Sequence, residues 1–265
     1  MIADIIVSLF VPAHRPERFA KAAAAQPDAV ILDLEDAVPS EAKETARAAL
    51  DCAFTHLPVL VRVNAAGTAW HAADLAAVAR LQPAAVLLPK AEDVDVVSRV
   101  AGAIGPVPVL ALVETARGLA AARALAAHPA VARLAFGSVD YCADLGCAHV
   151  PEALLAARSE LVLASRLAGL PAPIDGVTTA LDDAAMAEDD ARRARALGLG
   201  GKLAIHPRQI APIRAGFAPD ATEIAWAERV LASGEGAASV DGAMVDEPVR
   251  IRARAILARR GGAAG

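Results

Sequence analysis

The sequence predicts an α/β fold in which eight parallel strands close into a (β/α)₈ barrel, followed by a short C-terminal extension. Short apolar runs typical of buried parallel strands alternate with Ala-rich amphipathic segments along most of the chain. Eight such strand-then-helix units can be traced, and right-handed crossovers between them most simply close the sheet into a barrel. The length of 265 residues fits one domain of this kind.

The expected strands are short and mostly apolar. They cover residues 5–11, 29–32, 59–63, 85–88, 107–113, 133–136, 173–174 and 202–205. Helical patterns lie between them at residues 41–53, 72–80, 94–104, 116–127, 152–168 and 183–197. A doubly wound open sheet is the alternative fold. It needs no eighth strand and usually carries a glycine-rich phosphate loop, and the sequence shows no such loop.

The chain continues beyond the eighth strand for longer than a barrel needs. A helix at residues 221–232 is followed by a Gly-rich link at 234–236, the segment Val240-Asp241-Gly242-Ala243-Met244-Val245-Asp246 and a basic helix at 248–260. We therefore predict a catalytic barrel over residues 1–232 and a lid or extension over residues 233–265. We expect this extension to reach either across its own barrel mouth or onto a neighbouring subunit.

Composition and charge argue against several classes of binding partner and site. A net charge of −5 and the lack of a basic tract argue against nucleic acid. The longest mildly apolar stretch, between Arg99 and Glu114, is too short for a membrane span and contains Gly and Pro. Three cysteines without CxxC spacing indicate neither a disulfide framework nor a zinc site. With no signal-peptide pattern at the start, we expect a cytoplasmic protein with reduced cysteines and no membrane association.

Three polar residues stand at the carboxyl ends of expected strands, namely Arg62, Glu114 and Asp140. In a parallel barrel these ends meet on one face, where active sites lie. Two carboxylates and a guanidinium there indicate a divalent metal ion and a bound carboxylate substrate. The alternatives are structural: Glu114 as a helix-start acid, Asp140 in an Asx turn, and Arg62 in a salt bridge to a barrel acid.

A cluster of acids follows the second expected strand, where Asp33, Glu35 and Asp36 occupy three of four consecutive positions. Burying such charges requires compensating cations or protons. A nearby metal whose water molecules are held by Glu35 and Asp36 would meet that need, and a helix start rich in acids is the alternative. His206, at the end of the eighth strand, is either a general base or a structural cap. Zinc proteolysis and serine esterase chemistry lack their HExxH and Gly-x-Ser-x-Gly patterns.

Ordered motifs along the whole chain resemble the citrate lyase β-subunit and malyl-CoA lyase group, within the metal-dependent HpcH/HpaI aldolase superfamily. The LDLEDAV segment at residues 32–38 is highly specific to this group. The other matching pieces are Phe10-Val11-Pro12 with Arg15 and Lys21, Arg62-Val63-Asn64, Leu88-Pro89-Lys90, Glu114-Thr115, residues 137–146, Ala172-Pro173-Ile174-Asp175, Gly201-Lys202 and Ile205-His206-Pro207.

The resemblance implies a TIM barrel, often trimeric, that binds Mg²⁺ through the residues matching Glu114 and Asp140. It implies that the arginine matching Arg62 holds the oxoacid and stabilises developing enolate charge. It also implies that the acids matching Glu35 and Asp36 hold metal-bound water molecules.

The resemblance extends to residues outside the barrel rim. Arg15 and Lys21 match basic residues that contact coenzyme A. Met244-Val245-Asp246 matches a Met-Ile-Asp motif whose acid enters the active site of the adjacent subunit, so Asp246 is the expected acid/base. This chain has Val139 where many members have a glutamate immediately before the second metal ligand, which alters the charge of the substrate pocket.

These expectations together predict a Mg²⁺-dependent carbon–carbon lyase that cleaves a 3-hydroxy-3-carboxyacyl thioester of the citramalyl-, malyl- or citryl-CoA type. The products are an oxoacid (pyruvate, glyoxylate or oxaloacetate) and an acyl thioester, and the enzyme is expected to be a homotrimer or homohexamer. One alternative is a citrate lyase β-subunit acting on thioesters of an acyl-carrier protein. Another is a catalytically weak paralogue that binds oxoacids. A free 2-oxoacid aldolase is disfavoured, because His14 is poorly placed to be its base.

Overall fold

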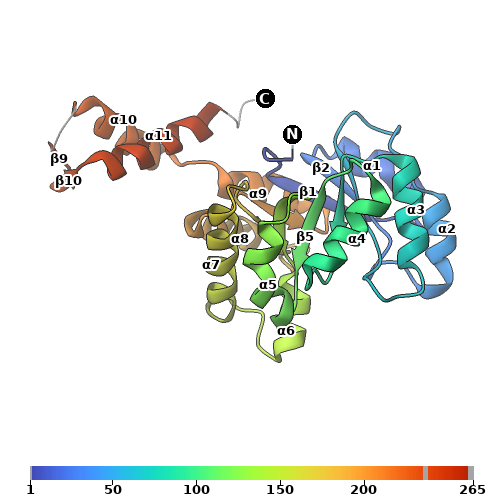
Figure 1. The fold of residues 1–265 in the computed structure, drawn as a ribbon. Coiled ribbons are helices and arrows are strands. Elements are labelled where there is room, and N and C mark those ends of the chain that lie inside the picture. The colour runs from blue at the N-terminus through green and yellow to red at the C-terminus, as the bar shows by residue number, and fades with distance from the viewer. Residues whose placement is uncertain (1, 235–237, 262–265) are drawn as a thin grey trace.

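The computed structural model describes residues 2–234 and 238–261, and its central feature is a closed barrel of eight parallel strands in sequence order (Figure 1). The barrel closes where β1 pairs with β8. The predicted (β/α)₈ TIM barrel is therefore confirmed. Its strands are β1 (Val7–Pro12), β2 (Ala29–Asp33), β3 (Val59–Arg62), β4 (Ala85–Leu88), β5 (Val109–Val113), β6 (Val131–Phe136), β7 (Ile174–Asp175) and β8 (Gly201–Ala204).

Helices surround the barrel on its outer side. They are α1 (Phe19–Ala24), α2 (Lys43–Ala48), α3 (His71–Leu81), α4 (Val94–Ile104), α5 (Ala116–Ala126), α6 (Ser138–Leu145), α7 (Pro151–Leu167), α8 (Ala184–Leu197) and α9 (Ile210–Phe217). The helix expected at residues 41–53 is shorter, because a 3₁₀ turn at Ser40–Ala42 precedes α2 and the helix ends at Ala48. The sequence patterns did not predict α6 or α9.

Strand residues alternate between two hydrophobic cores. Ile31, Leu60 and Leu112 belong to the cluster inside the barrel, whereas their neighbours pack outward against the helices. Burial on both faces explains why the strands are continuous apolar runs in the sequence. The same alternation places the residues two positions further along, Asp33 and Glu114, on the inner face at the carboxyl rim of the barrel.

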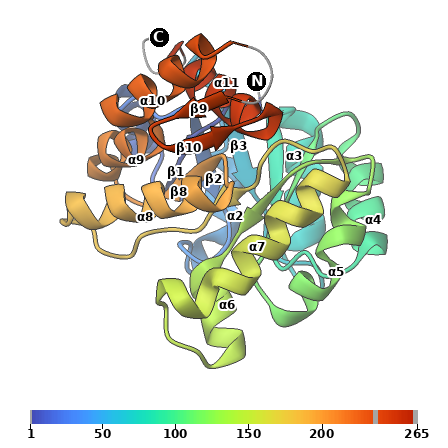
Figure 2. The ribbon, with the colours of Figure 1, turned by 90° about the vertical axis from the view of Figure 1, so that its left-hand side faces the viewer.

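The C-terminal extension has a small core of its own. It comprises α10 (Ala221–Ala232), the hairpin of β9 (Ala238–Val240) and β10 (Ala243–Val245), and α11 (Glu247–Gly261). Side chains of α10, β10 and α11 pack into a cluster separate from the barrel cores, and Figure 2 shows these elements side by side. This packing favours a domain boundary before α10, while the boundary after residue 232 stays a prediction. Part of the expected Gly-rich link, residues 235–236, lies outside the described residues.

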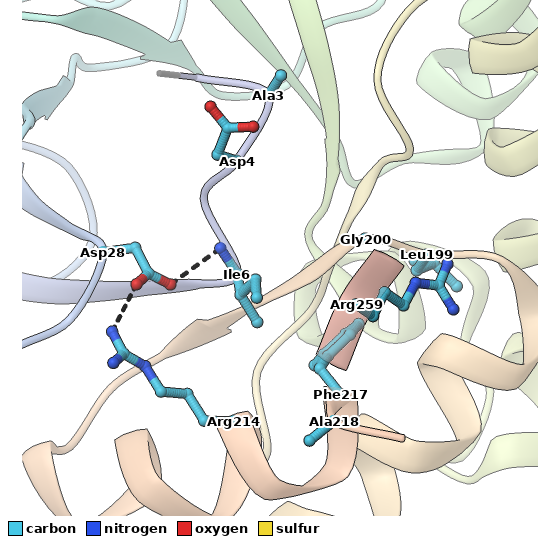
Figure 3. A pocket seen from close by; sticks show the side chains of 10 residues that line it. All are labelled: Ala3, Asp4, Ile6, Asp28, Leu199, Gly200, Arg214, Phe217, Ala218 and Arg259. Carbon is cyan, nitrogen blue, oxygen red and sulfur yellow. Dashed lines mark hydrogen bonds and ion pairs between the residues drawn. The ribbon is translucent and has the colours of Figure 1, made fainter. Parts of the chain in front are cut away.

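The extension lies at the amino-terminal end of the barrel. A cavity of about 410 Å³ at this end is lined by residues that precede strands, such as Asp4 and Gly200, and by Arg259 of α11 (Figure 3). In Figure 1 the extension and the N terminus lie in the upper part of the view, whereas α6, which follows the carboxyl end of β6, lies at the bottom. Of the two positions expected for the extension, its described residues do not occupy the first, across its own barrel mouth, and the contact with a neighbouring subunit stays a prediction.

Candidate active site

Arg62 is held at the carboxyl end of β3 by the aspartate directly across the β2–β3 pair. Asp33 Oδ1 accepts from Arg62 Nε at 2.7 Å and Asp33 Oδ2 accepts from Nη2 at 2.8 Å, a bidentate pair. Asp33 also accepts the backbone N–H of Glu35, and the guanidinium lies 4.8 Å from the centre of the Phe10 ring. These contacts fix the guanidinium and leave its Nη1 nitrogen directed toward Glu35 and Asp36.

Glu35 and Asp36 lie on the Nη1 side of Arg62. The Arg62 Nη1 nitrogen is 3.0 Å from Glu35 Oε2 and 3.4 Å from Asp36 Oδ2. Glu35 is buried, and its Oε2 atom is ion-paired with Arg62 Nη1 but receives no well-directed hydrogen bond from the described residues. Asp36 is exposed. A bound cation or its water molecules would complete the coordination of this buried oxygen.

Glu114 lies at the carboxyl end of β5 and is almost fully buried. Its Oε1 atom accepts the backbone N–H of Lys90 at 2.8 Å, and the Lys90 ammonium is 3.8 Å from the same oxygen. Gly137 lies directly against it, since a Cβ atom there would come within 2.3 Å of Glu114 Oε2. The glycine is therefore required for the packing of Glu114 itself.

Asp140 lies in the first turn of α6, which begins immediately after Gly137. It is half-buried, and its charge is close enough to raise the pKa of Glu114. Thr115 caps α5 by accepting the N–H of Gly118, so Glu114 is not needed as the helix cap. The structure thus brings Glu35, Glu114 and Asp140 to the same end of the barrel.

The pKa values of the buried acids show that burial makes their charged forms costly. Burial raises the pKa of Glu114 to about 8, with Glu35 and Asp140 adding to the shift. Burial also raises the pKa of Glu35 to about 7, although Arg62 and Lys90 act in the opposite direction. Five carboxylates meet three cations here, an excess of two negative charges: Asp33, Glu35, Asp36, Glu114 and Asp140 against Arg62, Lys43 and Lys90.

These features fit a hard divalent cation. Mg²⁺ prefers oxygen ligands and is usually bound by one or two carboxylates together with water and substrate oxygens. No group of three or more ligating side chains is preformed within residues 2–234 and 238–261, so the protein would supply two carboxylates and the remaining ligands would come from elsewhere. The excess of two negative charges supports this fit, and so does the incomplete hydrogen bonding of Glu35 Oε2.

The other expected site residues lie farther from this cluster. Arg15 follows β1 and Lys21 belongs to α1; both side chains are exposed. Asp246 precedes α11, accepts the N–H of Val249 and lies in the extension at the opposite end of the barrel. His206 accepts the N–H of Arg208 within a capping box, which favours the structural alternative for this residue.

Two contributors to the site were missed from the sequence. Asp33 was noticed only as part of the acid cluster, yet it is the residue that orients Arg62. Lys90 was noticed only in the Leu88-Pro89-Lys90 motif, yet its Nζ lies 3.2 Å from Glu35 Oε1. The position of Lys90 just beyond β4 was a signal that the rule for strand ends could have used.

The chain is similar to known proteins over most of its length. The model of the family HpcH/HpaI aldolase/citrate lyase matches residues 7–207. A citrate lyase subunit beta-like protein of Mycobacterium tuberculosis is 42% identical, covering 96% of this chain and 94% of its own. A (3S)-malyl-CoA thioesterase of Cereibacter sphaeroides is 34% identical, with coverages of 95% and 93%. The crystal structure of CitE from M. tuberculosis with magnesium, acetoacetate and coenzyme A superposes with a TM-score of 0.90 at 40% identity, covering 98% of this chain and 100% of that one.

The chain belongs to the HpcH/HpaI aldolase/citrate lyase family, as the sequence motifs predicted. The prediction of a metal-dependent lyase is confirmed at the level of this family, whose solved M. tuberculosis members hold magnesium with acetoacetate, pyruvate or oxaloacetate. No helix among the described residues is long and apolar enough to cross a membrane. Cys52, Cys142 and Cys147 are all free thiols.

Proposed function

We propose that this protein cleaves the carbon–carbon bond of a 3-hydroxy-3-carboxyacyl thioester such as citramalyl-, malyl- or citryl-CoA, in a Mg²⁺-dependent reaction. The main support for this proposal is the arrangement of buried acids at the barrel mouth. Buried Glu35 is paired with the oriented guanidinium of Arg62, and buried Glu114 lies near Glu35 at the barrel mouth, with an excess of negative charge that one divalent cation would balance. A related enzyme of the same fold holds magnesium, a 3-oxoacid and coenzyme A together.

The proposed reaction needs no water. The hydroxyl group of the substrate loses its proton to a base and becomes the keto oxygen of the released oxoacid. The electron pair of the broken bond passes to the acyl carbon, which then takes up a proton, so that overall one proton moves from the hydroxyl oxygen to the acyl carbon. Bound Mg²⁺ supplies Lewis acidity toward the hydroxyl and carboxylate oxygens of the substrate. Glu114 and Asp140 would hold this ion, and Glu35 and Asp36 would hold its water molecules.

Arg62 is the residue that faces the developing charge. Asp33 occupies Nε and Nη2, so the guanidinium cannot rotate, and Nη1 is the donor that reaches toward the mouth. A fixed donor of this kind binds the oxoacid carboxylate and stabilises negative charge without reorganising during the reaction. Exposed Arg15 and Lys21 would contact the phosphate groups of coenzyme A.

Asp246 is the proposed acid that delivers the proton to the acyl carbon. Because it lies at the far end of the barrel in its own chain, we propose that it reaches the mouth of a neighbouring subunit in a homotrimer or homohexamer. The exposed side chain of Met244 lies beside it on the hairpin and is available for that contact. The site is then complete only in the oligomer.

A panel of thioesters assayed with Mg²⁺ tests this proposal. Free coenzyme A thioesters and acyl-carrier-protein thioesters are offered separately, and the released oxoacid and free thiol are both measured. Oxoacid released with an intact acyl thioester supports the lyase, and turnover of the carrier-bound substrate alone supports a citrate lyase β-subunit role, as in the Escherichia coli relative that is 35% identical over 95% of this chain. Free thiol would support hydrolysis, the activity named for the Cereibacter relative. Oxoacid binding without turnover of any thioester would contradict the lyase and support the weak paralogue.

A further inference from the structure

Lys90 contacts both buried glutamates of the site through two different groups. Its backbone N–H donates to Glu114 Oε1 at 2.8 Å, while its ammonium lies 3.2 Å from Glu35 Oε1 and 3.8 Å from Glu114 Oε1. The residue has a φ of +46°, a conformation that non-glycine residues rarely adopt. The following residue is also fixed, since Ala91 donates its N–H to Leu112 of β5. The lysine is therefore held in place by β5.

We propose that Lys90 sets the charge of the site: its ammonium shares Glu35 and Glu114 with the divalent cation, weakens the binding of that cation and strengthens the binding of the anionic oxoacid. The inference rests on the proposed function, because it takes Glu114 as a metal ligand. It assigns Lys90 as a positioning residue of the site.

Coulomb's law gives the direction of both effects. A cation bound to Glu114 is repelled by an ammonium group 3.8 Å from the same carboxylate, so removing the ammonium should tighten metal binding. An oxoacid entering beside Arg62 carries negative charge, so the same removal should weaken its binding. The Lys90 side chain is 40% exposed, and solvent therefore reduces both effects without abolishing them.

The changes expected in Mg²⁺ affinity and in oxoacid affinity have opposite signs, and this distinguishes the proposed role from a purely structural one. If Lys90 only supported the fold of the rim, its replacement would loosen Glu114 and weaken metal and oxoacid binding together. Lys90→Met keeps the length of the side chain and the backbone N–H that holds Glu114, while it removes the charge. Lys90→Arg keeps the charge. Arg117→Met is the matched control, because Arg117 is an exposed cation three residues after Glu114.

Isothermal titration calorimetry tests the proposal in two steps: Mg²⁺ is titrated alone, and pyruvate is then titrated at saturating Mg²⁺. For Lys90→Met we expect the Mg²⁺ Kd to fall about tenfold and the pyruvate Kd to rise about tenfold. Lys90→Arg and Arg117→Met should keep both values near those of the wild type. Unchanged affinities in Lys90→Met, or a loss of both, would overturn the proposal.

A further variant, Glu114→Gln, separates this inference from the proposed function. If the wild type binds no Mg²⁺, or Glu114→Gln binds it equally well, the proposed function fails. If Glu114→Gln loses Mg²⁺ while Lys90→Met matches the wild type, the role of Lys90 alone fails.

Discussion

At the scale of single residues, the site depends on carboxylates that are costly to bury. Glu114 and Glu35 retain raised pKa values even though Lys90 and Arg62 lie beside them. Rim residues that directly follow apolar strands, such as Glu114 and Arg62, could be predicted from the sequence. Asp33 and Lys90 act through contacts between different strands. Those contacts depend on the register in which neighbouring strands pair, and no local sequence pattern specifies that register.

Replacing Glu114 with Gln should remove the negative charge while keeping the shape of the side chain. We expect Mg²⁺ affinity to fall about a hundredfold and lyase turnover about a thousandfold, because a metal ligand and its charge are lost together. Calorimetry and a coupled oxoacid assay measure the two effects. The exposed acid Glu152 at the start of α7 provides a matched Glu→Gln control. Equal Mg²⁺ affinity in wild type and Glu114→Gln would show that the ligand assignment is wrong.

The raised pKa values of Glu35 and Glu114 predict that stability depends on pH. Since both values lie above the ordinary 4.5, the folded protein binds these protons more tightly than the unfolded chain does. Without Mg²⁺, the free energy of unfolding should therefore fall as the pH rises from about 5 to about 8, on the order of 6 kcal/mol in total. Mg²⁺ should reduce this loss by stabilising the charged carboxylates. Denaturant unfolding with and without Mg²⁺ measures both, and identical pH profiles in the two conditions would contradict the account.

At the scale of elements, the junction between β6 and α6 positions the second carboxylate against the first. Gly137 brings the chain against Glu114, and α6 then presents Asp140 from its first turn. The amphipathic helix α4 was predicted with its observed bounds, and α5, α7 and α8 were predicted to within one residue at each end. The short helix α6 was not predicted, because the residues that follow Gly137 are also typical of a turn. The two-residue strand β7 is just long enough to pair with both neighbours.

Gly137→Ala tests this junction. The added Cβ would come within 2.3 Å of Glu114 Oε2, so either the helix or the glutamate must move. We expect a loss of stability of about 2 kcal/mol and a clear loss of Mg²⁺ affinity. Gly102→Ala in the last turn of α4 is the control, because its Cβ meets no atom within 4 Å. It should be neutral or stabilise by up to about 1 kcal/mol. Unchanged Mg²⁺ binding in Gly137→Ala would show that Glu114 does not need this close packing.

At the scale of the whole molecule, the catalytic mouth and the extension occupy opposite ends of the barrel. The sequence predicted that an extension exists, because the chain continues beyond the eighth strand. The sequence could not predict toward which end of the barrel the extension folds. An apolar pattern such as that of α10 indicates that one face of the helix is buried, but it does not indicate which surface covers that face. In the structure, α10 packs against α11, and the hairpin of β9 and β10 that precedes Asp246 lies at the end of the molecule opposite to α6.

Mixing two inactive variants tests whether subunits share sites. Asp246→Asn should abolish turnover while leaving oxoacid binding nearly unchanged, and Arg62→Ala should lose both. When the two proteins are unfolded and refolded together, some mixed oligomers should contain a site with native Arg62 and native Asp246, and activity should reappear. Each variant refolded alone is the control. Activity that stays absent in the mixture would count against a shared site.

We propose that the carboxyl rim of the barrel holds a divalent cation together with an oxoacid. A crystal structure of the protein soaked with Mg²⁺ and pyruvate would test this. We expect a metal ion bound by Glu114 and Asp140, with the pyruvate carboxylate against Arg62. Metal bound elsewhere, or a rim in which these side chains point apart and bind neither ligand, would contradict it.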